Sequence, residues 1–428
     1  MAKKTKQNSE VVTTNAEIKK DEKKSNVHDI FKSFHENMES VNLYFKKFGD
    51  LAINQDDTIK VQSKQFLDDV IADLNSERER RKLIKNGATE ENEESIEQDE
   101  EAGTFLKMLA KKISKQPKLS PKNFEILSRS SFLMLNNYFE YLLADLLTYY
   151  YDKFQNSLNT KEFKVSLQEL NEYETIDEII NHLISKEVES IIVEKTFDQL
   201  LNHFEDFLKI SLESDIIDWE SIIELRERRH LIVHNSSIVN KKYISRTKNP
   251  YNFKIGETLN IDNEYFINSF KQLRLAGQLL LFNCWGNWDK ENINRAVYEI
   301  LITSFESLSS NDYDIVCKIC KYSEQIKPKN AEQQDYILRI AINNAIALKK
   351  QSKKTELNKV LKNIQIGTAS PIFKIAHQIL EDNYIDLEEN FKKAILLGEL
   401  SIDYYLEWPI FDFVRENEEL NTKLMTTF

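Results

Sequence analysis

One segment of the chain, residues 218–243, combines imidazole and guanidinium groups at helical spacing. Its first apolar residues, Trp219 and Ile222, share one predicted helical stripe with arginines and histidines farther along. A guanidinium group on such a stripe is costly unless an anion pairs with it, so chemistry or a bound anion is the simpler explanation. An imidazole can exchange a proton near neutral pH. The catalytic candidates are therefore Arg229, His230 and His234.

The residues around these candidates predict a basic, RNA-binding surface. Between residues 226 and 254, eight basic residues and one acid give a local balance of +7, in a chain whose formal net charge is -12. Basic groups hold phosphates and aromatic rings stack on unpaired bases, which suits single-stranded RNA better than duplex DNA. A solvated basic loop is the alternative. The predicted RNA contacts are Arg226, Arg228, Asn235, Lys241, Lys242, Tyr243, Arg246 and Lys248.

The run from Arg229 to His234, RHLIVH, is an arginine, a polar residue, three further residues and a histidine. It resembles the signature of HEPN-domain proteins, small helical bundles of which many are metal-independent endoribonucleases. Asn235 and the IVNKKY stretch also resemble sequences seen after that signature. The resemblance spans residues 120–285. It implies RNA cleavage by the ribose 2′-hydroxyl, with His234 as general acid or base, Arg229 on the scissile phosphate and His230 orienting the phosphate or its partner.

The spacing within the motif raises a geometric problem. On a regular helix Arg229 and His234 point roughly 140° apart, so they cannot both face one phosphate unless the helix ends or bends between them. The family's answer is a site shared by two protomers, so the resemblance implies a homodimer. Arg226 and Glu224 are second-rank candidates, as a phosphate contact and an orienting carboxylate.

Other interpretations of these residues stay open. His230 and His234 could bind a metal, but no further ligand follows at a suitable spacing, so we predict neither a metal nor a cofactor. Arg229 could instead pair with a carboxylate of the bundle, Asp145 or Glu140, in a purely structural role. The protein would then be a non-catalytic RNA-binding or protein-interaction helical scaffold.

The whole chain is predicted to be all-α. With 8 Gly and 6 Pro in 428 residues, long uninterrupted helices are favoured and no glycine-rich phosphate loop is possible. The expected parts are a disordered lysine-rich tail, an N-terminal helical region with an acidic loop, a HEPN-like helical bundle, and a helical-repeat (tetratricopeptide-like) domain. The tail is expected at 1–27 and the N-terminal helical region at 28–119, with its acidic loop at 87–103. The HEPN-like bundle is expected at 120–287 and the helical-repeat domain at 288–428.

Helical periodicity gives more detailed expectations. A long helix is predicted to start at Ser120-Pro121, whereas residues 236–258 are predicted to form an ordered loop or a small hairpin. The other helices of the bundle are expected at 176–186, 188–211, 218–234 and 262–285. Those of the last domain are expected at 296–308, 313–324, 333–350, 354–364, 372–382, 387–397 and 401–413.

The location and biological role follow more indirectly. Three cysteines make no disulfide framework, the N-terminus has no apolar stretch of a signal peptide, and no apolar run reaches the ~20 residues that cross a bilayer. We therefore expect a cytoplasmic protein without a membrane segment. A nuclease bundle joined to a recognition domain resembles a bacterial toxin or antiviral (abortive-infection) effector. Its expected partners are RNA, a second copy, and a protein trigger or regulator at the C-terminal domain.

Overall fold

The computed structural model describes residues 26–87, 107, 122–159, 162–364 and 369–428. Within these ranges every named element is a helix, and the only β pairing is an isolated bridge between Ile238 and Thr258. The predicted all-α fold is thus confirmed. None of the described helices has the length and apolar character needed to cross a membrane. The predicted tail and acidic loop fall, except for Asn26, Val27 and Gly87, outside the described residues.

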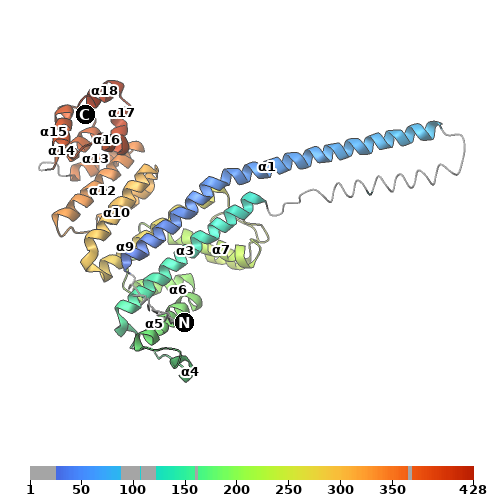
Figure 1. Cartoon of the computed structure of the whole chain (residues 1–428), viewed down its shortest axis with the longest axis horizontal. Helices are drawn as coiled ribbons and strands as arrows, with labels where there is room; N and C mark the ends of the chain where they lie inside the picture. The colour runs from blue at the N-terminus through green and yellow to red at the C-terminus, as the bar shows by residue number, and fades with distance from the viewer. Residues whose placement is uncertain (1–25, 88–106, 108–121, 160–161, 365–368) are drawn as a thin grey trace, which may run out of the picture.

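Three long helices form the centre of the molecule: α1 (Val27–Gly87), α3 (Asn123–Lys153) and α9 (Asn263–Trp288). Figure 1 shows α1 and α3 side by side with opposite directions, and the second half of α1 extending beyond the bundle. The first half of α1 packs into the core because apolar residues recur there every three or four positions. These residues are Val27, Ile30, Phe31, Phe34, Met38, Val41 and Phe45.

Two local features fix how these helices meet. Asp56 of α1 accepts hydrogen bonds from the backbone N–H groups of Asn123 (2.9 Å) and Phe124 (3.0 Å), and so caps the start of α3. Gly277 of α9 lies where side chains of α1 and α3 pack against the backbone of α9, since a Cβ there would be 2.3 Å from Cζ of Phe34 and 2.9 Å from Cδ2 of Leu142. A larger residue at position 277 would push α1 and α3 away from α9.

Shorter helices flank this centre. They are a 3-10 turn (Gln155–Leu158), α4 (Leu167–Leu170), α5 (Ile176–Glu194), α6 (Phe197–Asn202) and a π-helical turn (His203–Phe207). The helix expected at 188–211 is instead divided at Lys195. The division arises because Thr196 and Gln199 form a capping box, which starts a new helix.

The segment with the candidate residues forms α7 (Trp219–His234) and α8 (Lys241–Thr247). Residues 236–258 form an ordered loop around α8, as one of the two alternatives predicted. Tyr243 and Ile244 are helical and do not form a strand of a hairpin, because the side chain of Asn240 accepts from the backbone N–H of Tyr243 and starts a turn of helix there.

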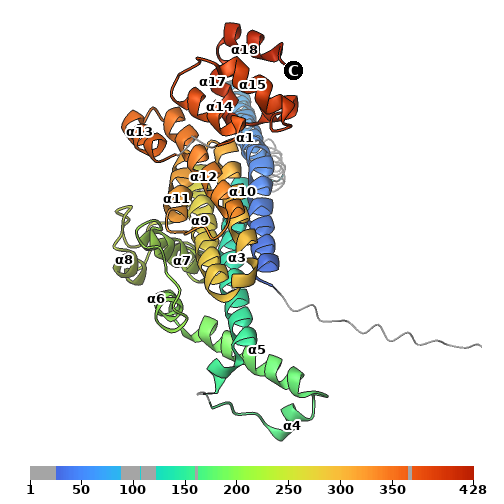
Figure 2. The same ribbon diagram turned by 90° about the vertical axis from the view of Figure 1, so that its left-hand side faces the viewer.

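Among the C-terminal helices, those between positions 293 and 350 lie alongside α9 in Figure 2, and those after position 370 lie above the bundle. Pro409 interrupts the helix expected at 401–413, and α18 was not predicted. The tetratricopeptide-like repeat stays a prediction. The helices are α10 (Ile293–Ser309), α11 (Tyr313–Ser323), α12 (Ala331–Lys350), α13 (Lys354–Asn363), α14 (Pro371–Leu380), α15 (Leu387–Leu396), α16 (Ile402–Glu407), α17 (Asp412–Arg415) and α18 (Glu418–Met425), with 3-10 turns at Lys290–Asn292 and Pro409–Phe411.

The apolar interior crosses two of the expected domain boundaries. The larger buried cluster contains the first half of α1 together with α3 and α9. It also contains Leu301, Cys320 and Ile340, from α10, α11 and α12. A second cluster of buried apolar residues, which includes Ile346 and Phe391, holds the later helices together. The bundle therefore includes residues before position 120 and is continuous with helices after position 287.

Candidate functional site

Helix α7 positions all three catalytic candidates. Asp218 caps its start by accepting from the backbone N–H of Ser221 at 3.1 Å. The stripe that begins with the buried residues Trp219 and Ile222 reaches the surface before it arrives at His230. The second half of α7 buries a different face, with Leu225, Arg228 and Leu231 inside. The catalytic candidates consequently lie where α7 leaves the core.

The structure brings the two histidines together and turns the arginine away. His230 and His234 are both exposed, and their ring centroids are 4.8 Å apart on successive turns. Because α7 stays helical up to His234, the angular offset between Arg229 and His234 remains. Arg229 points to α3, where its Nη2 lies 3.7 Å from Oε2 of Glu140. One protomer thus presents an imidazole pair with a half-buried guanidinium beside it.

His230 is held in its neutral form over a wider pH range than a free histidine. Although His230 is exposed, neighbouring protein atoms exclude part of the water around its ring, which lowers its pKa below the usual 6.5, and the positive charges of Lys242, His234 and Arg229 act in the same direction. Glu227 opposes them but is outweighed. A neutral imidazole has a free ring nitrogen that can accept a hydrogen bond or a proton near pH 7. His230 is therefore suited to accept a proton.

The titration of His230 is expected to have its midpoint below 6.5 and to move upward in Lys242→Met. Burial is the largest cause of the shift and Lys242 is the next, so this substitution restores only part of it. An NMR titration of the imidazole Cε1–H signal measures the midpoint. Lys241→Met is the matched control, because Lys241 is exposed and is not among the groups that shift His230. Equal midpoints in wild type and Lys242→Met would contradict this explanation.

Arg226 and Arg229 share a carboxylate on α3. Oε1 of Glu140 lies 2.5 Å from Nη2 of Arg226, and Oε2 is the atom near Arg229. Asp145, the other carboxylate considered for Arg229, forms no ion pair within the described ranges. The pairing with Glu140 is one of the two that the structural interpretation of the motif offered.

Arg228 and Tyr243 belong to a buried network rather than to the surface. Glu224 accepts from Nε of Arg228 (2.8 Å) and the hydroxyl of Tyr243 (2.5 Å) on one oxygen, and from the hydroxyl of Tyr265 (2.5 Å) on the other. The guanidinium carbon of Arg228 lies 3.7 Å from the ring centroid of Tyr265. Burial and the charge of Glu224 raise the pKa values of both tyrosines, which keeps their hydroxyl protons in place.

This network changes the interpretation of two predicted RNA contacts. Arg228 and Tyr243 have side chains that solvent barely reaches, so direct contact with RNA does not suit their positions. They attach α8 to α7 instead. Glu224, a second-rank candidate, is the centre of the network. Tyr265 was missed because it lies 41 residues from Glu224 in the sequence and has only its aromatic type as a signal.

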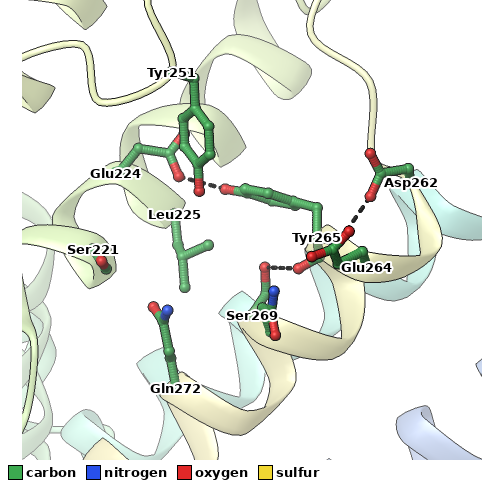
Figure 3. A pocket seen from close by; sticks show the side chains of 10 residues that line it. Ser221, Glu224, Leu225, Tyr251, Asp262, Glu264, Tyr265, Ser269 and Gln272 are labelled. Carbon is green, nitrogen blue, oxygen red and sulfur yellow. Dashed lines mark hydrogen bonds between the residues drawn. The ribbon is translucent and has the colours of Figure 1, made fainter.

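A cavity of about 270 Å³ lies between α7 and α9, next to this network. Figure 3 shows Glu224, Asp262 and Glu264 around it, together with the rings of Tyr251 and Tyr265. Its lining contains three carboxylates and no lysine, arginine or histidine. Because carboxylates repel phosphate, this side of α7 does not suit an RNA backbone.

Carboxylates neutralise part of the positive charge of the basic loop. Arg246 pairs with Glu227 (2.9 Å) and Asp198 (3.3 Å), and Lys248 pairs with Glu220 (2.5 Å). Asn235 donates to the carbonyl of Ile238 at 2.6 Å, which closes the turn after α7. The remaining predicted RNA contacts, Lys241 and Lys242, are exposed and have no ion-pair partner in the part of the chain that the structure describes.

No third metal-ligating side chain joins His230 and His234: the described residues contain no group of three or more His, Cys, Asp or Glu side chains that could hold an ion. Comparisons with protein-family models, curated proteins and solved structures found no match to this chain.

Proposed function

We propose that the protein is a metal-independent endoribonuclease of the HEPN type. The observation that carries this proposal is the pair of exposed imidazoles 4.8 Å apart, one of which has its pKa lowered by its surroundings. Two such groups supply a proton acceptor and a proton donor without any metal. The exposed Lys241 and Lys242 lie beyond them on α8 and provide charge for an RNA backbone.

The proposed reaction is transesterification within the RNA strand. One imidazole removes the proton of a ribose 2′-hydroxyl, and the 2′-oxygen attacks the adjacent phosphorus. The bond from phosphorus to the 5′-oxygen breaks, that oxygen takes a proton from an imidazolium, and a 2′,3′-cyclic phosphate remains. His234 acts as one of these two groups, the acid or the base, and His230 is the second imidazole, which also orients the phosphate or its partner. Arg229 stabilises the charge that develops on the phosphate.

The remaining parts of this proposal come from the resemblance to HEPN domains. Because Arg229 and His234 point in different directions on α7, we propose a homodimer in which two motifs meet. The proposed biological role is a cytoplasmic toxin or antiviral effector. A protein trigger or regulator would bind the C-terminal helices, which are proposed to form a tetratricopeptide-like repeat.

Wild-type protein is expected to cut single-stranded RNA in the presence of EDTA. Imidazole-catalysed attack by the 2′-hydroxyl needs no metal, and it leaves 2′,3′-cyclic phosphate ends. Gel analysis of the fragments, with acid treatment to open the cyclic ends, provides the measurement. An RNA strand with a 2′-O-methyl group at each ribose is the control, because it lacks the nucleophile. Fragments from that strand, or cutting abolished by EDTA, would contradict the mechanism.

A second candidate is a scaffold that binds RNA or protein without cutting. The observation that favours it is the paired state of Arg226, Arg229, Arg246 and Lys248, each of which has a carboxylate partner. A scaffold would bind RNA and leave it intact. If it binds only protein, neutralising Lys241 and Lys242 would change no RNA affinity.

A further inference from the structure

Glu140 stands between the two arginines that the proposed nuclease would use on RNA. It pairs with Nη2 of Arg226 at 2.5 Å and with Nη2 of Arg229 at 3.7 Å. The guanidinium carbon of Arg226 also lies 5.2 Å from the ring centroid of Phe197, which fixes that side chain in place. One carboxylate neutralises one of two guanidinium groups, so the three side chains together keep a net positive charge.

Two N–H groups of this cluster lack an acceptor. Nη1 of Arg226 and Nε of Arg229 are buried and have no hydrogen-bond partner among the described residues. A buried donor without an acceptor is costly, and guanidinium groups bind oxyanions through paired hydrogen bonds. Unpaired donors and surplus charge both favour an additional anion at this position. Glu140 contacts Nη2 of each arginine, and neither of the two unpaired nitrogens donates a hydrogen bond to it in this arrangement.

We propose that Glu140 is a positioning residue, which holds Arg226 and Arg229 in the RNA-free protein and yields them to a phosphodiester when RNA binds. The inference rests on the proposed function. A phosphodiester presents acceptor oxygens to guanidinium groups as a carboxylate does, so the exchange needs no movement of α7. The side chain of Glu140 is 22% exposed, so its carboxylate has access to solvent once it is displaced.

The test compares the RNA affinities of wild type and Glu140→Gln, with a fluorescent single-stranded RNA made uncleavable by 2′-O-methyl groups. Removing the competing charge is expected to raise the affinity about threefold to tenfold and to steepen the plot of log K against log salt by about 0.7, the value for one more phosphate contact. Asp145→Asn is the matched control. It removes one charge from the same helix, at a carboxylate that forms no ion pair within the described ranges.

Two further variants separate release of the arginines from other effects. In an Arg229→Gln background, Glu140→Gln is expected to give a smaller gain in affinity, because one of the two released groups is gone. Glu140→Asp keeps the negative charge on a shorter side chain, and it replaces Glu140→Gln in the test if that variant does not fold. Its expected gain in RNA affinity is smaller than that of Glu140→Gln but measurable. Equal affinity in wild type and both Glu140 variants overturns the inference and leaves the nuclease proposal standing. If wild type binds no RNA, both fail.

Discussion

Replacing His234 by alanine is expected to lower the rate of RNA cleavage by ~10²–10⁴-fold, the usual contribution of a general acid or base. The side chain lies at the exposed end of α7, so its loss removes the proton-transfer group without opening a cavity. The measurement is the initial rate of cleavage in EDTA, at equal protein concentration and equal content of folded protein. RNA affinity is expected to stay close to that of wild type, because Lys241 and Lys242 are unchanged.

Val233→Ala is the matched control for this substitution. Val233 precedes His234 on α7 and is 47% exposed, so its truncation tests whether any loss of side chain at this helix end impairs activity. We expect cleavage by Val233→Ala to equal that of wild type. Cleavage by His234→Ala at the wild-type rate would exclude His234 as the acid or base, and the scaffold interpretation would then be preferred.

Replacing Arg228 by methionine is expected to lower the free energy of unfolding by about 3–5 kcal/mol, the typical cost of breaking a buried ion pair from one side. The substitution leaves the Glu224 carboxylate in the interior without its cation, held only by the hydroxyls of Tyr243 and Tyr265. It also removes the hydrogen bond from Nη1 of Arg228 to the carbonyl of Asn260 at 3.2 Å. Urea denaturation followed by circular dichroism measures the effect.

The comparison for this variant is Lys248→Met, which removes a cation from an ion pair on the surface. Both Lys248 and its partner Glu220 have side chains that are 74% exposed, and water screens such a pair almost completely. Lys248→Met is therefore expected to unfold at the same urea concentration as wild type. Equal stability of Arg228→Met would mean that the network around Glu224 does not hold α8 against α7.

The helices could be predicted from the sequence because their signals are local. The start of α7 at Trp219 follows from the capping residue Asp218, and the long α3 follows from apolar residues at helical spacing. The signal failed where two local preferences compete. Around Tyr243, β-branched and aromatic neighbours favour a strand, but the Asn240 cap decides for a helix.

The charges of the site could not be predicted in the same way, because their partners are distant in the sequence. The predicted balance of +7 counted one acid nearby and omitted Glu140, which lies 86 residues before Arg226, and Asp198, which lies 48 residues before Arg246. Neighbours on a helix also face different directions: Arg228 points into the interior while Arg229 points to α3. Only the packing of α7 against its neighbouring helices shows which of the two arginines is buried in the interior and which faces α3.

The continuity of the core between α9 and the C-terminal helices decides how this protein can be divided into fragments. Leu301, Cys320 and Ile340 bury their side chains in the same cluster as Trp285. A cut at residue 287 would therefore expose the apolar surfaces on both sides, at a cost of roughly 25 cal/mol for each Å². A minimal folded fragment that contains α7 would have to retain α10–α12, and it would also need the first half of α1.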